Sequence, residues 1–444
     1  LLTAKPLFAD ELASQLASGE ALYNAQCATC HAMNLRGSAH GSALRGSAFT
    51  EQWASRNSTA LLRYNQSRMP PGSSDTLSET QHLSIVAHLL KNNGIDLPQA
   101  LTPEAPVSVA TGEPIDIKPG EALESWGSAD TIDEAARSKS GFTNRPLERF
   151  SPVTEAMLAK PPPGDWLSWR RTRDGQAYSP LDQIDRGNVD QLKLAWVLAM
   201  HDGSNQVTPL VHDGIMYLTH PGNIVQAVAA DTGDVIWEYR YRFPAEARTL
   251  GGPTRNIAIY GDKLFLATYD AAIVAIEART GEELWRTPKA DYREAYTHPA
   301  GPIVGGGVVL SGINGCEMFT RDGCFITGHD PDTGKELWRT STIALPGSAG
   351  NETWGDMPPE LRGGSDTWLA GSYDAELDLF FIGTSQAKPW VAASRGMSPL
   401  DHALYTNSTL AIEPRTGKMA WYFQHMPGET IDMETGFERV IVDG

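Results

Sequence analysis

The feature that most restricts how this chain can fold is a short unit that recurs along its second half. The unit reads Thr-Gly, three further residues and then Trp, and it ends at Trp237, Trp285, Trp338 and Trp421. Its glycine suits a turn with positive φ, and its tryptophan can pack on a neighbouring sheet. Ordinary hairpins would also contain such turns, but four copies of one unit favour a repeat. Units of about 40–50 residues with four short strands are typical of a β-propeller, which we expect over residues 161–444.

The first part of the chain, residues 8–95, has helical patterns instead. A short helix is expected to begin within residues 18–23. Ser78 and Gln81 have the spacing of a capping box, and residues 80–92 then place apolar side chains on one helical face. These patterns predict a small all-α domain ahead of the propeller.

One motif in this helical part indicates a cofactor. In Cys27-Ala-Thr-Cys30-His31, two thiols can add to the vinyl groups of haem while the adjacent imidazole reaches the iron. A redox CxxC pair would be expected near a βαβ unit, and half of a zinc site would need a second ligand pair nearby. The sequence shows neither, so the motif predicts haem c.

The second axial ligand of that haem is expected to be Met69, on a loop stiffened by prolines just before the last helix. A lone methionine is usually a core residue, but this position favours a ligand. Met33 is too close to His31 to reach the opposite face of the haem. The competing ligands are His40, His82 and His88. The segment resembles a small single-haem cytochrome c domain.

The charge of the chain argues against a nucleic-acid partner, and its hydropathy argues against a membrane-spanning helix. The chain of 444 residues has 36 basic and 54 acidic side chains, a net charge of −18, and an acidic surface repels phosphate backbones. No apolar run approaches the ~18 residues that a membrane-spanning helix needs. We therefore expect no nucleic-acid partner and no transmembrane segment.

Residues 96–160 are rich in proline and predict a linker or strap that lies partly over a neighbouring domain.

The propeller segment resembles the first half of a pyrroloquinoline quinone (PQQ) dehydrogenase of the methanol dehydrogenase type. The stretch 175–184 and the Thr-Gly-x3-Trp units carry the resemblance from Trp166 to Gly444. It implies an eight-bladed propeller, of which about the first half is present here. The remaining blades, and any PQQ-binding Lys or Arg on them, are then missing from residues 1–444.

The resemblance also implies a cofactor site. Four stretches match it: Gly315-Cys316-Glu317, Asp366-Thr367-Trp368, Gly383-Thr384-Ser385-Gln386 and the loop 427–432. Glu317, Gln386 and Asp432 are then metal ligands, and Asp432 is also the catalytic base. Trp368 lies under the quinone ring. Further contacts to PQQ are expected from Gln206, Arg255, Asn314, Gly315 and Cys316.

The chemistry of these residues is coherent. A hard cation prefers carboxylate and carbonyl oxygens, and it would polarise the quinone carbonyl. Asp432 would take the alcohol proton while hydride passes to the quinone. Ca²⁺ is the expected metal. A lanthanide is the alternative, because Glu434 stands where lanthanide-using relatives carry an extra carboxylate.

Three departures from the family pattern stand out. The stretch 248–252 lacks the adjacent cysteine pair of methanol-oxidising members, and Gln386 replaces Asn, which lengthens its reach by one methylene. Cys316 and Cys324 either pair across a hairpin or stay as two buried thiols. The chain lacks an initial Met and ends in a strand-like run, so we expect both ends to be cut.

The order of haem before propeller resembles polyvinyl-alcohol dehydrogenase-type quinohaemoproteins, as does the stretch 395–410. We therefore expect oxidation of a primary, secondary or polymeric alcohol to an aldehyde or ketone, with electrons passing to haem c in the same chain. The external acceptor would be a soluble cytochrome, a cupredoxin or the quinone pool. Covalent haem attachment implies a periplasmic or secreted protein.

Two other functions fit parts of the sequence. One is a PQQ-dependent sugar or aldehyde dehydrogenase. The other is a non-catalytic propeller scaffold, as in outer-membrane assembly factors, fused to an electron carrier. A scaffold has no reason to keep Glu317, Gln386 and Asp432 in this order.

Overall fold

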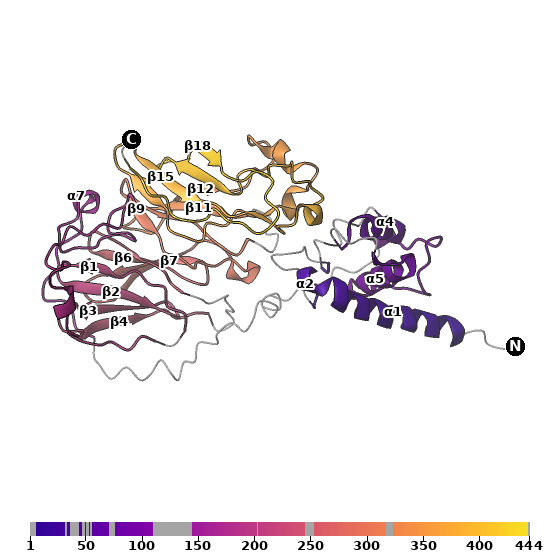
Figure 1. Ribbon diagram of the computed structural model, residues 1–444, viewed down its shortest axis with the longest axis horizontal. Helices are drawn as coiled ribbons and strands as arrows, with labels where there is room; N and C mark the ends of the chain where they lie inside the picture. Colours follow the sequence, from indigo (N-terminus) through magenta and orange to yellow (C-terminus); the bar gives the residue numbers. More distant parts are fainter. Residues whose placement is uncertain are drawn as a thin grey trace.

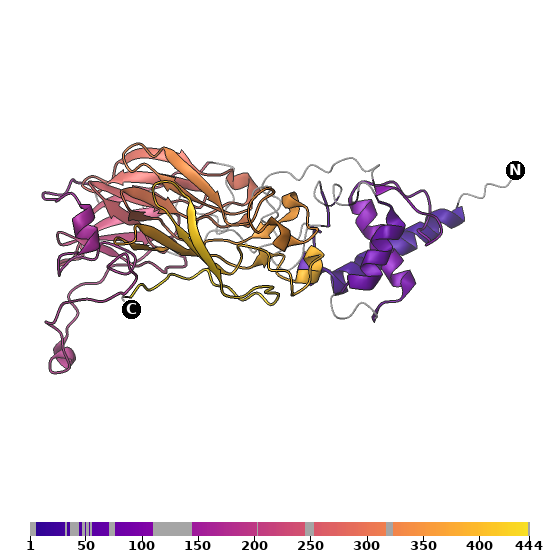
Figure 2. The same cartoon turned by 90° about the horizontal axis from the view of Figure 1, so that it is seen from above.

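The computed structural model contains a helical domain beside a larger β domain, as Figures 1 and 2 show. It describes residues 6–31, 33–35, 44–46, 49, 53, 56–70, 76–109, 144–201, 203–244, 253–316 and 323–442. Within these ranges, no helix is both long and apolar enough to cross a membrane.

The helical domain is built on two long helices that cross closely. Its helices are α1 (Pro6–Gln26), α2 (Ala28–His31), α4 (Ser58–Arg68) and α5 (Glu79–Asn92). The expected helix start near residue 18 was wrong, because α1 already begins at Pro6. Gly19 marks a close helix crossing instead: a Cβ there would lie 2.0 Å from the carbonyl oxygen of Ser84 on α5.

The start of α5 follows the sequence prediction. The Ser78 hydroxyl accepts a hydrogen bond from the Gln81 amide, and the Gln81 side chain accepts one from the Ser78 amide. The predicted capping box is therefore confirmed. Most of α5 is buried, and Leu101 and Val109 join the same core. The beginning of the proline-rich stretch thus packs on the helical domain.

Among the described residues, the β domain contains four sheets of four antiparallel strands each, with the strands of each sheet in chain order. The strands are β1 (Leu210–His212), β2 (Ile215–His220), β3 (Ile224–Ala229) and β4 (Val235–Arg240); β5 (Ala258–Tyr260), β6 (Lys263–Ala267), β7 (Ala272–Glu277) and β8 (Glu283–Pro288); β9 (Ile303–Gly305), β10 (Val308–Ser311), β11 (Phe325–His329) and β12 (Glu336–Ser341); β14 (Ser372–Asp374), β15 (Leu379–Gly383), β17 (Ser408–Ile412) and β18 (Met419–Gln424). This is the sheet pattern of propeller blades. The expected all-β propeller after an all-α domain is confirmed.

Smaller elements lie before the first blade, between the blades and within the fourth blade. A fifth sheet pairs β13 (Gly363–Gly364) with β16 (Ala387–Lys388). The short helices are α7 (Glu155–Ala159), η4 (Val189–Gln191), η5 (Tyr292–Glu294), η7 (Asn351–Trp354), η8 (Pro359–Leu361) and η9 (Ala392–Arg395).

The repeated tryptophans connect one blade to the next. Trp237, on the fourth strand of the first blade, is fully buried, and its Nε1 donates to the carbonyl oxygen of Ala278 at 3.2 Å. Gly281, in the next Thr-Gly turn, has φ of 76°, and a Cβ there would lie 2.7 Å from the Trp237 ring. Trp338 meets Gly417 in the same way. The repeat therefore encodes contacts between blades as well as turns.

The chain just before the propeller packs along the blades. Leu147, Val153 and Leu158 are buried in the core of the first blades, and Val153 forms an isolated bridge with Gly261. Residues 110–143 of the expected linker lie outside the described residues.

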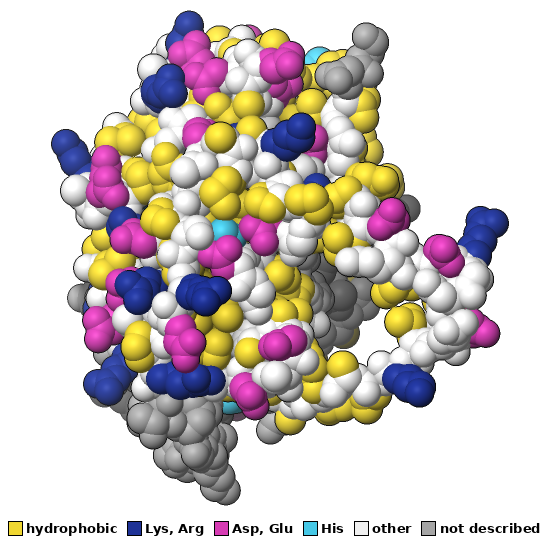
Figure 3. Space-filling model, turned by 90° about the vertical axis from the view of Figure 1, so that its left-hand side faces the viewer, with side chains coloured by type: hydrophobic (Ala, Val, Ile, Leu, Met, Phe, Trp, Pro, Cys, Tyr) yellow, Lys and Arg dark blue, Asp and Glu magenta, His cyan; other side chains and the backbone are white. Residues whose placement is uncertain are grey.

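At the end of the propeller remote from the helical domain, the described residues form no charge patch of one sign (Figure 3). Figure 3 shows Lys and Arg side chains interspersed there with Asp and Glu. The net negative charge of the chain is therefore not gathered on that face.

The antiparallel strand order determines at which end of a blade each functional loop lies. Loops before a first strand, after a second strand and after a fourth strand all lie at the same end of a blade. Arg255 and Trp368 precede first strands, Gln386 follows a second strand, and Asp432 follows a fourth. These four predicted site residues therefore lie at the same end of the propeller.

Candidate functional site

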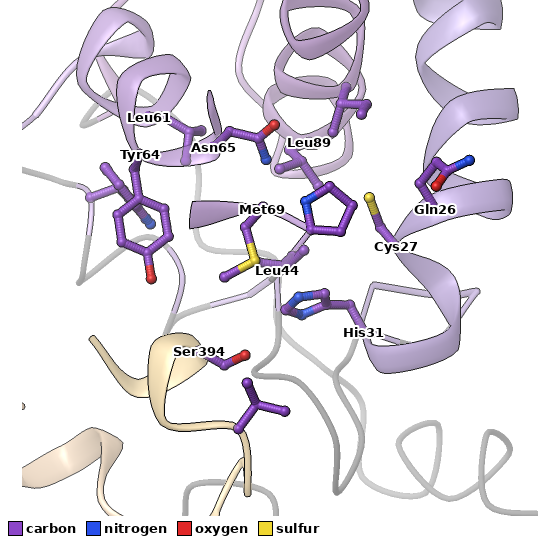
Figure 4. A pocket seen from close by; sticks show the side chains of 14 residues that line it. Gln26, Cys27, His31, Leu44, Leu61, Tyr64, Asn65, Met69, Leu89 and Ser394 are labelled. Atoms are coloured by element: carbon purple, nitrogen blue, oxygen red, sulfur yellow. The ribbon is translucent and has the colours of Figure 1, made fainter. Parts of the chain in front are cut away.

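The helical domain contains a cavity lined by both proposed haem ligands. His31, at the end of α2, and Met69, at the end of α4, face this cavity, together with Cys27 (Figure 4). Its apolar walls are Leu44, Leu61, Ile85 and Leu89. An imidazole and a thioether in an apolar pocket are a donor set that fits haem iron. Cys30 lies on α2, and its side chain is outside the described atoms.

The competing ligands are placed less well. The His82 ring nitrogen Nδ1 lies 2.6 Å from Asn65 Oδ1, and His82 is not among the residues that line the cavity. The His88 ring packs against Tyr23 in a tilted arrangement, and burial lowers the pKa of His88. Met33 is largely exposed, and His40 lies outside the described residues.

In the propeller, three predicted PQQ-contact residues form one group with Glu434. The Arg255 guanidinium lies over the Trp368 ring, 5.2 Å from its centroid, and Arg255 Nε donates to Gln206 Oε1 at 2.9 Å. Burial lowers the pKa of Arg255. The Trp368 indole N–H donates to a Glu434 carboxylate oxygen. An indole plane beside a cation suits a flat anionic cofactor.

A second group surrounds Asp432, which has a left-handed backbone with φ of 64°. The side-chain Nε2 of Gln386 donates a hydrogen bond to Asp432 Oδ1, and Lys388 Nζ lies 3.4 Å from the same oxygen. The Asp432 side chain is 41% exposed, so a small substrate can reach it. Asp tolerates the left-handed region better than most residues, and such conformations cluster at functional sites.

Gln386 supplies the observation that tests whether a cation fits here. Its side chain is fully buried, and its Oε1 has no hydrogen-bond partner among the described residues. A buried carbonyl oxygen without a partner is costly unless something else binds it. Next to the Asp432 carboxylate, it offers the oxygen donors that a hard cation prefers. These residues therefore fit the expected metal.

The segments that carry these residues are tied together by Asp366. Its buried carboxylate accepts hydrogen bonds from the backbone amides of Gly315 at 3.0 Å and Cys316 at 3.3 Å. The Ser385 hydroxyl lies 3.2 Å from its other oxygen. Asp366 thus connects the chain at Cys316 with the residues just before Trp368 and Gln386.

The remaining predicted residues lie close by or outside the described chain. Asn314 pairs with Thr297 through the backbone. Cys316 and Cys324 form a disulfide with their Cα atoms 5.3 Å apart, so the pairing alternative is confirmed. Glu317 lies outside the described residues.

Sequence reasoning did not identify two residues of this site, Lys388 and Asp366. Lys388 lies two residues after Gln386, and alternation along an extended segment sends both side chains to one side. That spacing was an available signal. Asp366 stands near the motif residue Trp368 without a signal of its own, because its bonds to Gly315 and Cys316 join residues far apart in sequence.

Comparison with known proteins assigns the two domains of this chain to known families. A family model described as the β-propeller domain of PQQ glucose, ethanol and alcohol dehydrogenases matches residues 166–443. A second model, of subunit III of cbb3-type cytochrome c oxidase, matches residues 14–89. The helical domain is thus of the cytochrome type. The chain belongs to the family of PQQ glucose, ethanol and alcohol dehydrogenase propellers.

Individual relatives agree with this assignment. Quinohemoprotein alcohol dehydrogenase ADH IIB of Pseudomonas putida is 37% identical over 283 residues, covering 61% of this chain and 41% of that protein. The structure of ADHIIG from Pseudomonas putida HK5 matches with a TM-score of 0.57 and 33% identity, covering 65% of this chain and 44% of that one.

A europium-containing methanol dehydrogenase matches with a TM-score of 0.57 and 28% identity, covering 63% of this chain and 52% of that one. This chain therefore spans about half or less of the length of the relatives it matches.

Proposed function

We propose that this chain oxidises an alcohol to an aldehyde or ketone with PQQ and passes the electrons to a covalently bound haem c in the same chain. One observation carries the proposal: the buried Gln386 Oε1 has no hydrogen-bond partner among the described residues, and the same side chain contacts Asp432. A non-catalytic scaffold gives no reason for that arrangement.

The residues have distinct proposed roles. Glu317, Gln386 and Asp432 hold Ca²⁺, and Trp368 forms the floor under the cofactor. Arg255 and Gln206 bind its edge, together with the chain at Asn314, Gly315 and Cys316. A lanthanide is the alternative metal, supported by Glu434 two residues beyond Asp432 and by the structural likeness to a europium-containing methanol dehydrogenase.

Asp432 is the proposed base. Bound PQQ supplies a hydride acceptor, and the protein supplies the proton acceptor and the positions. Asp432 takes the hydroxyl proton of the alcohol, while Lys388, 3.4 Å from Oδ1, stabilises the carboxylate. The alcohol loses two electrons and two protons. A haem held by His31 and Met69 would accept one electron at a time, so the two electrons from each alcohol would require two haem reductions.

The haem ligands and the location follow from the same chemistry. Cys27 and Cys30 bind haem covalently, and His31 and Met69 coordinate its iron. Such attachment supports a periplasmic or secreted protein. A soluble cytochrome, a cupredoxin or the quinone pool is the proposed external acceptor.

Haem absorbance tests the function directly. In full-length protein reconstituted with PQQ and Ca²⁺, members of an alcohol panel should reduce the haem. The rate should not depend on protein concentration, because a tether keeps the two centres at roughly millimolar effective concentration. A rate that rises linearly with protein concentration would contradict transfer within the chain. Reduction by sugars or aldehydes but by no alcohol would favour the other dehydrogenase class.

Replacing Met69 by Ala should remove the weak charge-transfer band of methionine-ligated ferric haem, because the thioether sulfur would no longer reach the iron. The haem itself should stay attached after denaturation and an acid–acetone wash. Met33→Ala is the matched control, since Met33 is 68% exposed and should leave the band intact. A band that survives in Met69→Ala would place the axial ligand elsewhere.

A further inference from the structure

One short segment of the propeller contacts both candidate centres. At its beginning, Gln386 and Lys388 contact Asp432. A few residues later, Val391 and Ser394 line the cavity that also contains His31 and Met69. Figure 4 shows Ser394 on the propeller turn, facing the side where these two ligands lie. The segment 386–395 therefore runs from the proposed base to the proposed haem.

This segment is internally braced. The buried Arg395 guanidinium donates through Nη1 to the carbonyl oxygen of Pro389, and the carbonyl oxygen of Ala387 lies 3.4 Å away. Burial lowers the pKa of Arg395 to about 10, so the side chain stays charged at neutral pH. These bonds tie the turn η9 back to β16, which carries Lys388. The turn and the base-side strand are thus one structural unit.

The helical domain meets this unit beside its cavity. Tyr64 Oη donates to the carbonyl oxygen of Ala393 at 3.3 Å, a contact between residues 329 positions apart. Tyr64 also lines the cavity, together with Met69 and Ser394. Tyr64, which lines the cavity, therefore also contacts the propeller.

We propose that the turn at residues 391–395 is the surface on which the cytochrome domain docks within its own chain. Docking there closes the haem cavity against the segment that contacts Asp432. This inference rests on the proposed function and specifies how the two centres are held together. It also implies that an external acceptor meets a different face of the cytochrome domain.

The test is a charge placed at the docking surface. In Ser394→Glu, a carboxylate would face the apolar cavity wall, and its desolvation should disfavour the docked arrangement. Small-angle scattering of the full chain, without substrate, should then show a larger radius of gyration. The second measurement uses the PQQ- and Ca²⁺-loaded protein and compares two rates, that of haem reduction and that of dye-linked alcohol oxidation. In Ser394→Glu, the ratio of the first rate to the second should fall by about tenfold, which corresponds to a tenfold weaker docking equilibrium. Haem content per chain checks that the cytochrome domain has folded.

The matched control is Leu400→Glu, which adds the same charge a few residues away on a side chain that is 85% exposed. It should change neither the radius of gyration nor the ratio. An unchanged radius and ratio in Ser394→Glu would overturn the docking proposal. Wild-type protein that oxidises no alcohol would refute the proposed function instead, and the scattering comparison would still report on docking.

Discussion

Replacing Asp432 by Asn should lower the turnover of alcohol oxidation by about 10²–10⁴-fold, the usual contribution of a positioned general base. Asn keeps the size of the side chain and an oxygen toward the metal, but it cannot accept the alcohol proton. The left-handed backbone at residue 432 is also tolerated by Asn. Dye-linked oxidation at saturating PQQ measures the loss, and the cofactor spectrum checks that PQQ is still bound.

An acid on the propeller surface provides the control for that variant. Asp356 is exposed, and Asp356→Asn removes the same charge without touching the site. It should keep wild-type turnover. If Asp432→Asn also kept near-normal turnover, the loop 427–432 would not carry the base.

Replacing Trp237 by Ala should lower the free energy of unfolding of the propeller by about 3–5 kcal/mol, the usual cost of removing a large buried aromatic side chain. Trp237 is fully buried, and it fills the space over Gly281 in the next blade. Its loss would leave a cavity between two blades and remove the hydrogen bond to Ala278. Denaturant unfolding followed by far-ultraviolet circular dichroism measures the change.

Trp421 gives a matched comparison, because it occupies the same place in the repeat but is 46% exposed. Trp421→Ala should cost clearly less free energy of unfolding than Trp237→Ala. We attribute the stabilising effect of Trp237 to its burial against the turn of the next blade. Equal losses of unfolding free energy in the two variants would contradict this, because Trp421 is much less buried.

The sequence predicts those parts of the molecule that short-range patterns encode. The capping box at Ser78 sets the start of α5, and the Thr-Gly-x3-Trp unit sets the blades. In both cases a turn or cap needs particular residues at fixed spacing, so the pattern is visible without a structure. Resemblance added Gln206, Arg255 and Trp368, which the structure brings together.

What the sequence could not predict depends on contacts between distant residues. Residues 18–23 predict a helix start, but α1 begins earlier, and Gly19 is the point where α1 crosses α5. Asp366 accepts hydrogen bonds from amides about fifty positions away, and Tyr64 meets Ala393 across the two domains. Such pairings have no fixed spacing, because they arise only when whole elements pack.

The tryptophan–glycine contacts also bear on how such a propeller can be recombined. Trp237 belongs to one blade and Gly281 to the next, so the packing unit is offset from the blade itself. A graft that exchanges whole blades would separate each tryptophan from the turn shaped to receive it. Crossover points placed between the Thr-Gly turn and the tryptophan that follows it would keep each such pair in a single parent. Chimeras cut at those points should therefore fold more often than chimeras cut in the loops between blades.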